Sequence, residues 1–451
     1  MLDRIGFLVE QLNSPVYEER RAALAELAKR PHSGAGSQNF NLHCHSFFSF
    51  NAEGWSPSRI VYEARRAGLY AAGLCDFDVL DGLDEFYRAG LALGVRTTVH
   101  LETRAFMRDY ASVEINSPGE PGVAYVMGAG FAEEPEEGTT QAAGLAGFRE
   151  RARARNLALI SRINPHVPQI ALDYERDVLP LTPAGVATER HIVRAYVLKA
   201  REYFGRPEAV ARFWSGMVGR PYEETVVLLA DPAGLEELVR ARFVKRGGLG
   251  YEQPSPDSFP PIEEFIRWTL SCGAMPMITW LDGMSEGEKN GRAMLQNMVG
   301  KGACALNIIP DRNWRISDPA ARARKVAALR EIVAAADSMD LPINIGTEMN
   351  RHGLPFVDDL DGPVLSEFKR SFIMGANVMV GQALLHRYAD FSYVGSDAQA
   401  AFPDRASRNR FFGKVGALPP LDERQADSLD EMGPEKAFDW FSDRTRELGV
   451  G

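Results

Sequence analysis

The sequence predicts an α/β protein whose strands close into a barrel, and the prediction depends on three observations. Apolar segments with few charges alternate with amphipathic segments along much of the 451-residue chain, a pattern typical of strands followed by helices. About seven or eight such units occur, which favours a barrel. No GxGxxG or GxxxxGK[ST] phosphate loop follows the first expected strand, which speaks against the alternative, a doubly wound sheet.

The N-terminal third supplies the first strand–helix units. Residues 1–38 form a helical extension with Leu and Ala at helical spacing, ended by Pro31 and a Gly/Ser linker. Strands are expected at 40–45, 70–76, 96–106 and 122–131, and helices at 58–67 and 83–93.

The pattern then becomes mostly helical from about residue 139 to 262, which predicts a helical insertion within a barrel that extends over 39–400. The strand–helix alternation resumes with strands expected at 274–280, 304–310 and 341–349, and a further candidate at 390–397. The intervening helices are expected at 287–299, 320–336 and 365–375. Residues 401–451 are predicted to be a C-terminal tail of loops and a surface helix.

Composition excludes several function classes. The 51 Lys and Arg against 61 Asp and Glu give a net charge of −10, which argues against a general nucleic-acid binder or a protein that binds anionic membranes. The four cysteines lack CxxC spacing, so neither a disulfide scaffold nor a thiolate zinc site is expected. The same observation predicts a cytoplasmic location. No secretory signal and no membrane span is expected, since charges interrupt every apolar run.

Chemistry-bearing residues follow the expected strands. In a parallel barrel the reacting groups lie where strands end. The first strand ends in His43-Cys44-His45, and residues i and i+2 share one side of a strand, so both imidazoles can bind one metal. Asp76, Glu102 and Glu348 follow or end other strands and add the oxygen donors that suit Mn, Mg, Fe or mixed zinc sites.

These motifs resemble the polymerase and histidinol phosphatase (PHP) family. His43-Cys44-His45-Ser46 with Phe48-Ser49 matches its HxHT motif, Asp76-Phe77-Asp78 with Gly82 its TDHD motif, and Glu102 its G.E segment. Thr188 to Ala195 resembles the R-x-H-I-A-R-A segment of the branch that hydrolyses nucleotide bisphosphates and short RNA ends. Residues 273–281 and 345–350 fall where that branch has its Ala-His-Pro and G-S-D-x-H motifs. The resemblance covers roughly residues 39–355 in the family's order.

The resemblance implies a distorted (β/α)7 barrel and phosphoester hydrolysis at a metal cluster. By position it assigns His43, His45, Glu102 and Glu348 to one metal site and His191 to a second. Where the family has further ligands, this chain has Phe50, Phe77, Trp280 and Asn350. Phe and Trp bind no metal, so one or two divalent ions (Mn, Zn or Fe) are expected in place of three.

Other residues near the motifs have two open interpretations. Asp76 is either a general base or a residue that holds a histidine tautomer. A second group of polar residues follows strand ends, namely Asp282, Asp311, Arg312 and Asn313. These residues either replace the missing histidines, in which case Arg312 is assigned to catalysis, or form turns and ion pairs. Guanidinium groups that suit phosphate binding are present at Arg190, Arg194 and Arg351.

The predicted function is therefore a metal-dependent hydrolase, a phosphoesterase with metal-activated water that acts on a small phosphorylated substrate. One alternative is a barrel that binds a ligand or partner without catalysis. Another is a hydrolase of a different bond, such as a C–N bond or a carboxylic ester.

Overall fold

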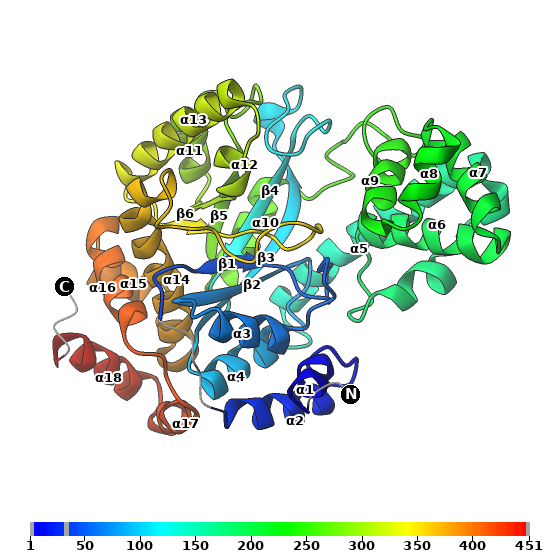
Figure 1. The fold of residues 1–451 in the computed structure, drawn as a ribbon. Helices are drawn as coiled ribbons and strands as arrows, with labels where there is room; N and C mark the ends of the chain where they lie inside the picture. The colour runs from blue at the N-terminus through cyan, green and yellow to red at the C-terminus, as the bar shows by residue number, and fades with distance from the viewer. Residues whose placement is uncertain (1–3, 31–35, 448–451) are drawn as a thin grey trace.

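The computed structural model describes residues 4–30 and 36–447 and contains one seven-stranded sheet whose strands follow one another in chain order (Figure 1). Residues 31–35, which include Pro31 and the first part of the expected linker, lie outside the described residues, as do 1–3 and 448–451. The strands are β1 (Asn41–Cys44), β2 (Ala71–Phe77), β3 (Arg96–Phe106), β4 (Val123–Ala129), β5 (Met275–Trp280), β6 (Ala305–Ile308) and β7 (Ile343–Ile345).

The first and last strands meet and nearly close the sheet into a barrel. The Glu348 backbone N–H donates to the His43 carbonyl over 2.7 Å, and the His45 N–H donates to the Glu348 carbonyl over 2.9 Å. Cys44 and Glu348 form a parallel bridge there. The sequential strand order and this closure confirm the predicted barrel and exclude the doubly wound sheet.

One strand runs against the others. β4 is antiparallel to both β3 and β5, whereas the other neighbouring pairs are parallel. A β3–β4 pair of this kind places the end of β3 beside the start of β4, with Arg104 opposite Tyr125. The ends of the parallel strands therefore share one rim of the barrel with the beginning of β4.

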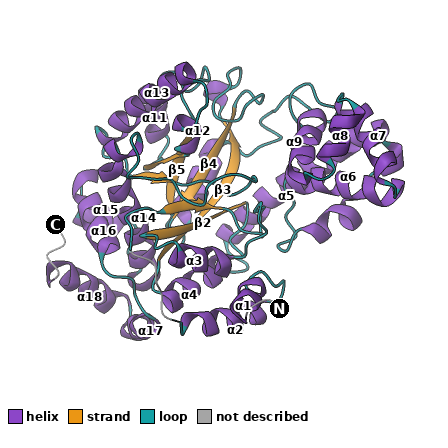
Figure 2. Ribbon diagram, in the orientation of Figure 1, coloured by secondary structure: helices purple, strands orange, loops and turns teal. Residues whose placement is uncertain are grey.

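Helices surround the barrel on its outer side (Figure 2). Their apolar faces pack on strands that are buried along their length, as expected for strands covered on both faces. The helices on this side are α3 (Pro57–Arg66), α4 (Leu83–Leu93), α10 (Ile262–Ser271), α11 (Gly291–Gly300) and α13 (Pro319–Asp337), while α12 (Asp311–Trp314) is a short helix after β6 and α14 (Lys369–Ala389) covers one end.

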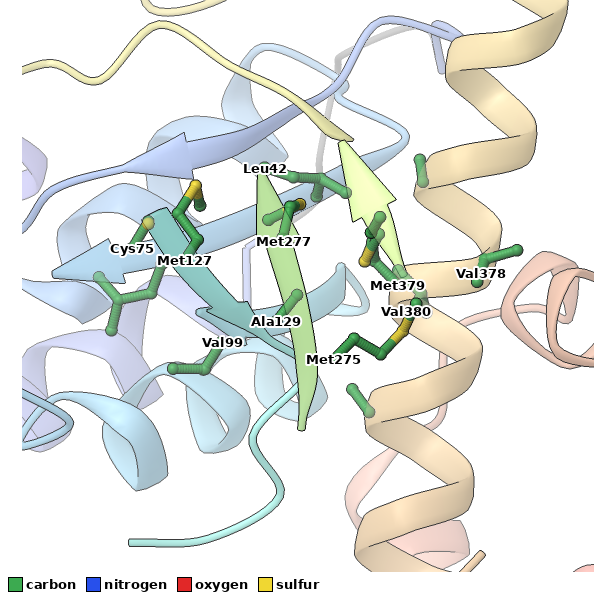
Figure 3. Close-up of a cluster of buried hydrophobic side chains, with 14 of the residues drawn as sticks. Leu42, Cys75, Val99, Met127, Ala129, Met275, Met277, Val378, Met379 and Val380 are labelled. Atoms are coloured by element: carbon green, nitrogen blue, oxygen red, sulfur yellow. The ribbon is translucent and has the colours of Figure 1, made fainter. Parts of the chain in front are cut away.

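Helix α14 packs against the end of the barrel opposite the site residues. The Gln382 side chain donates to the carbonyls of Gly130, just after β4, and Gly273, just before β5. Met379 and Val380 of α14 lie beside Val99, Ala129 and Met275 in the core (Figure 3). The end of the barrel where the parallel strands finish is therefore the one that α14 leaves uncovered.

Two helical groups flank the barrel. The insertion has its own buried core, which includes Tyr196, Trp214 and Phe243, and consists mainly of α5 (Thr140–Ile163), α6 (Glu189–Phe204), α7 (Pro207–Val218), α8 (Tyr222–Leu228) and α9 (Pro232–Phe243). At the N-terminus lie α1 (Arg4–Gln11) and α2 (Tyr17–Ala28), the latter held to α4 by a buried ion pair between Arg20 and Glu85.

Two expectations near the C-terminus were wrong. Residues 390–397 form no strand but a turn that begins at Asp390, in a left-handed conformation that ends α14. The predicted tail of loops and one surface helix is instead mostly helical and packs on α14, with α15 (Ser396–Ala401), α16 (Arg405–Ala417), α17 (Glu423–Met432) and α18 (Pro434–Glu447). No described helix is long and apolar enough to cross a bilayer.

Candidate metal centre and active-site cavity

Three buried side chains converge at the rim where β1, β2 and β7 end and β3 continues past them. His43 and His45 project from the end of β1, and Glu102 from β3. One potential ligand atom from each lies within 4.8 Å of the others. The Glu102 carboxylate is 3.8 Å from Nε2 of His43 and 3.4 Å from Nε2 of His45. The i, i+2 spacing of the two histidines therefore delivers both imidazoles to one point, as the alternation of a strand predicts.

Asn307 fixes the tautomer of His43. Nδ1 of His43 lies 3.3 Å from Oδ1 of Asn307. That oxygen also accepts a hydrogen bond from Asn344, its neighbour across the β6–β7 register. Since an amide oxygen can only accept, Nδ1 of His43 carries the proton and Nε2 presents its lone pair to Glu102 and the space between them.

Asp76 and Ser49 fix the tautomer of His45 in the same way. The Ser49 hydroxyl donates its hydrogen to Asp76 over 2.7 Å, so its oxygen accepts from Nδ1 of His45, 3.2 Å away. Asp76 also accepts from the backbone N–H and hydroxyl of Ser46, at 2.6 and 2.5 Å. Of the two predicted roles for Asp76, this geometry fits the positioning of a histidine, because its oxygens are occupied by donors.

The three residues fit a divalent metal. Among the described residues, Nε2 of His43 and Nε2 of His45 are buried without a hydrogen-bond partner, and buried polar atoms are rarely left so. Two neutral imidazole nitrogens and a carboxylate suit Zn, Mn or Fe and leave coordination positions open for a ligand.

The charge of Glu102 suits the binding of a cation at this centre. Burial alone would raise the pKa of Glu102, but the neighbouring imidazoles, His43 above all, outweigh it and lower that pKa to about 2. Burial would lower the pKa of His43, and the Glu102 charge reverses the effect, so that pKa is raised. Glu102 is thus a carboxylate at neutral pH, and any proton that His43 takes up on Nε2 must leave when a metal binds.

Glu348 lies beside this centre but pairs with a cation. Its carboxylate accepts from Arg312 over 2.9 Å, and it is not one of the three grouped ligands. Glu348 and Asp78, both at the rim, have positive φ angles of 66° and 58°. Strained residues of this kind concentrate at functional sites.

The other predicted site residues lie in different places. The His191 ring packs edge-on against Phe50, and its Nδ1 accepts from the Thr188 N–H at the start of α6. Burial, and next the Arg194 charge, lower the His191 pKa to about 3. Arg190 lines the cavity and pairs with Glu237, whereas Arg194 pairs with Glu236 outside the lining. Arg351 is exposed and does not line the cavity.

The residues at positions where the PHP pattern has further ligands also lie in different places. Phe77 and Asn350 line the cavity. Trp280 does not, because strand alternation turns Thr279 inward and Trp280 away. Asp282 pairs with Lys325, Asp311 lies 3.6 Å from Arg315, and the Asn313 amide donates to two backbone carbonyls. None of these last three lines the cavity, so a turn with ion pairs describes them better than replacement of histidines.

A cavity of about 540 Å³ opens above the metal centre. The barrel supplies its floor and the insertion one wall. The Tyr125 ring packs edge-on against Phe77, with its hydroxyl toward the charged residues Arg104, Glu189 and Arg240. Positively charged side chains dominate the lining, namely Arg104, Arg155, Arg190, Arg240, Lys245, Arg246 and Arg312, against Asp78, Glu102, Glu189 and Glu348.

Sequence reasoning missed several residues that shape this site. Ser49 was expected only to belong to a motif, and no role was predicted for Asn307 or Asn344. Polar side chains within otherwise apolar strands, as in Ala305–Ile308 and Ile343–Ile345, are the signal that could have found them. Arg155 lies in a run of arginines on α5 that gives no such signal.

Comparisons with known proteins add two structural likenesses. No family model matches the chain, and no curated protein does. An amidohydrolase from Chromobacterium violaceum, solved with bound sulfate and no metal, is 16% identical with a TM-score of 0.47. A candidate metal-dependent phosphoesterase from Bifidobacterium adolescentis is 19% identical with a TM-score of 0.46. Each likeness covers 74% of this chain and 96% of the other. At these scores neither assigns the chain to a family or an activity.

Proposed function

We propose that this protein is a metal-dependent hydrolase that cleaves phosphoesters. The observation that carries the proposal is the buried group of His43, His45 and Glu102, with both Nε2 atoms unpartnered within the described chain, at the floor of a cavity rich in cations. The motifs shared with the PHP family support the same chemistry. The arginine and lysine side chains that line this partly enclosed cavity favour an anionic substrate such as a phosphoester.

Each part of the cavity has a role in this proposal. His43, His45 and Glu102 would hold the metal, which supplies Lewis acidity toward the ester oxygen and activates water. Ser49 and Asn307 hold the proton of each neutral ring on Nδ1, so that Nε2 is the nitrogen left to bind the metal. Arg312 reaches the centre from α12, the short helix after β6, and is placed to neutralise charge on an anionic substrate beside Glu348.

The test is turnover by protein freed of metal with a chelator and then loaded with Mn, Zn or Fe. Phosphomonoesters, phosphodiesters and nucleotides form the panel, and elemental analysis gives the metal bound per chain. His43→Ala and Glu102→Gln should each reduce both bound metal and turnover by about 100-fold or more. His166→Ala is the matched control, since His166 is exposed and lies outside the cavity lining.

The alternatives give different results in the same assay. Metal binding without turnover of any phosphoester would overturn the proposal. Stabilisation by a small molecule without product would then indicate a binding module, and release of a carboxylate or an amine from ester or amide substrates would indicate a hydrolase of another bond.

A further inference from the structure

The cavity has a second positively charged region away from the metal centre, formed by β3 and α5. Arg104 lies two residues beyond Glu102 on β3 and on the same face of the strand. Arg155 reaches the cavity from α5. Their guanidinium carbons lie 4.9 Å and 4.4 Å from the centre of the same ring, that of Phe259. Two like charges are therefore held close together at one aromatic side chain.

Arg155 differs from the other cations of the cavity because it has no carboxylate partner. Among the described residues, each of the others forms an ion pair: Arg104 with Glu120, Arg190 with Glu237, Arg240 and Lys245 with Glu189, Arg246 with Glu114, and Arg312 with Glu348. Arg155 makes one hydrogen bond in the described chain, from Nη1 to the Ser258 carbonyl over 2.8 Å. A guanidinium has five N–H donors, so most of those on Arg155 are free for a ligand.

The surroundings do not neutralise this charge. Asp78 and Glu120 lie close enough to affect Arg155, but Oδ1 of Asp78 accepts from the Thr103 hydroxyl over 2.6 Å and Glu120 is paired with Arg104. The single charge of Glu189 serves both Arg240 and Lys245. Burial, and next the Arg104 charge, lower the pKa of Arg155 to about 10. A half-buried, unpaired guanidinium beside a second one is costly unless an anion completes it.

Space for such an anion is present. A second cavity of about 290 Å³ shares Arg104, Arg155, Asn156 and Glu189 with the lining of the main one. The two arginines therefore lie where the cavities adjoin, and a group held there is accessible from the side of the metal centre.

We propose that Arg155, together with Arg104, forms an anion-binding subsite that takes an oxyanion group, a phosphate or a carboxylate, at a distance from the group held at the metal centre. The subsite does not require catalysis. That its occupant belongs to a substrate with a second anionic group rests on the proposed function.

The test is direct binding of inorganic phosphate, and separately of acetate, to the full chain after chelator treatment, measured by calorimetry. Phosphate should bind, and Arg155→Met should weaken binding about 10-fold or more, because charge-assisted bonds to a guanidinium fork are lost. Arg155→Lys should retain part of the affinity. Arg153→Met, on the same helix but paired with Glu175 and outside the lining of both cavities, and His43→Ala should leave it unchanged.

The outcomes separate this subsite from the proposed function. Absence of phosphate and acetate binding, or binding that is lost in His43→Ala but kept in Arg155→Met, would overturn the subsite even if the metal-loaded protein hydrolyses phosphoesters. Binding of phosphate, acetate or both at Arg155 by a protein without turnover would support the subsite and refute the hydrolase. If one of the two anions binds more strongly, the comparison shows whether the subsite prefers a phosphate or a carboxylate. Circular dichroism of each variant checks that it folds.

Discussion

The guanidinium of Arg312 lies 2.9 Å from the carboxylate of Glu348, beside the point where the first and last strands of the barrel meet. This pair keeps Glu348 out of the group formed by His43, His45 and Glu102. Arg312 therefore competes with a metal for the same carboxylate, and its own charge opposes a cation in the centre.

Removal of Arg312 should strengthen metal binding. In Arg312→Met the Glu348 carboxylate becomes a fourth ligand, and we expect the dissociation constant for Mn²⁺ or Zn²⁺ to fall by about 3- to 10-fold. Turnover of phosphoesters should fall at the same time. Calorimetric titration checks the first effect, with Arg190→Met, which removes another paired cation of the cavity, as the control. Weaker metal binding in Arg312→Met would contradict this account.

Ser49→Ala should weaken metal binding without removing a ligand. The substitution breaks the connection from Asp76 to Nδ1 of His45, so the proton is no longer held on that nitrogen. Loss of such outer contacts typically lowers metal affinity 10- to 100-fold. Competition with a fluorescent chelator measures the change. Ser117→Ala, elsewhere in the cavity wall, should have no effect, and Ser49→Thr, which keeps the hydroxyl, should restore much of the affinity.

Metal affinity should fall as the pH is lowered. The pKa of His43 is raised, because the Glu102 charge outweighs the effect of burial, and a protonated imidazole cannot bind a metal. Below that pKa the dissociation constant should rise about 10-fold per pH unit for each proton displaced. Calorimetry between pH 6 and 8.5, in buffers that differ in ionisation enthalpy, gives the number of protons released. A metal affinity that does not change over this range would show that metal binding displaces no proton from His43.

Asp358 should make the protein less stable at alkaline pH. Burial raises its pKa to about 7, and Oδ2 has no hydrogen-bond partner within the described chain. Between pH 3.8, the usual value, and about 7, the unfolded chain has lost a proton that the folded protein keeps, so stability decreases as pH rises. Asp358→Asn should therefore raise the melting temperature at pH 8 and change little at pH 4. The exposed neighbour Asp359 provides the control, Asp359→Asn, with no expected change at either pH.

Gly375 of α14 should tolerate no side chain. A Cβ there would lie 1.9 Å from the carbonyl oxygen of Ile343 in β7, so Gly375→Ala should separate helix and strand and lower the free energy of unfolding by about 2 kcal/mol or more. A Cβ at Gly147 of α5 would meet nothing within 4 Å among the described residues. Gly147→Ala should instead stabilise the helix by about 0.5–1 kcal/mol. Urea unfolding of both variants tests the contrast, and equal effects would contradict it.

The sequence was sufficient for the barrel and for the group at its rim, because both follow from local patterns. Strand and helix periodicity places the seven strands, and the spacing of His43 and His45 places both rings on one side of β1. The strand expected at 390–397 failed because an apolar run is buried equally well in a turn, and Tyr393 is buried there.

Other parts of the site depend on which strands become neighbours. The contact of Asn307 with Asn344 requires the register of β6 and β7, and no property of either segment alone specifies it. The ion-pair partner of an arginine likewise cannot be identified from the sequence, because it depends on which segments meet in the fold. Thus Arg194 was assigned to substrate binding but pairs with Glu236, whereas Arg155 went unnoticed among its neighbours on α5.

The reversed direction of β4 determines the end of the barrel at which α5 begins. Because β4 runs against the parallel strands, the chain leaves it at the closed end of the barrel, where Gln141 at the start of α5 contacts Ser271 just before β5. At 1.5 Å per residue, the ten residues from Thr140 to Arg149 span about 15 Å. They bring the chain to the open rim, where Arg149 donates to the carbonyl of Asp78, and the last turns of α5 continue into the core of the insertion. One residue inserted into α5 before Arg155 would rotate the Arg155 side chain by about 100° about the helix axis and so turn it out of the cavity.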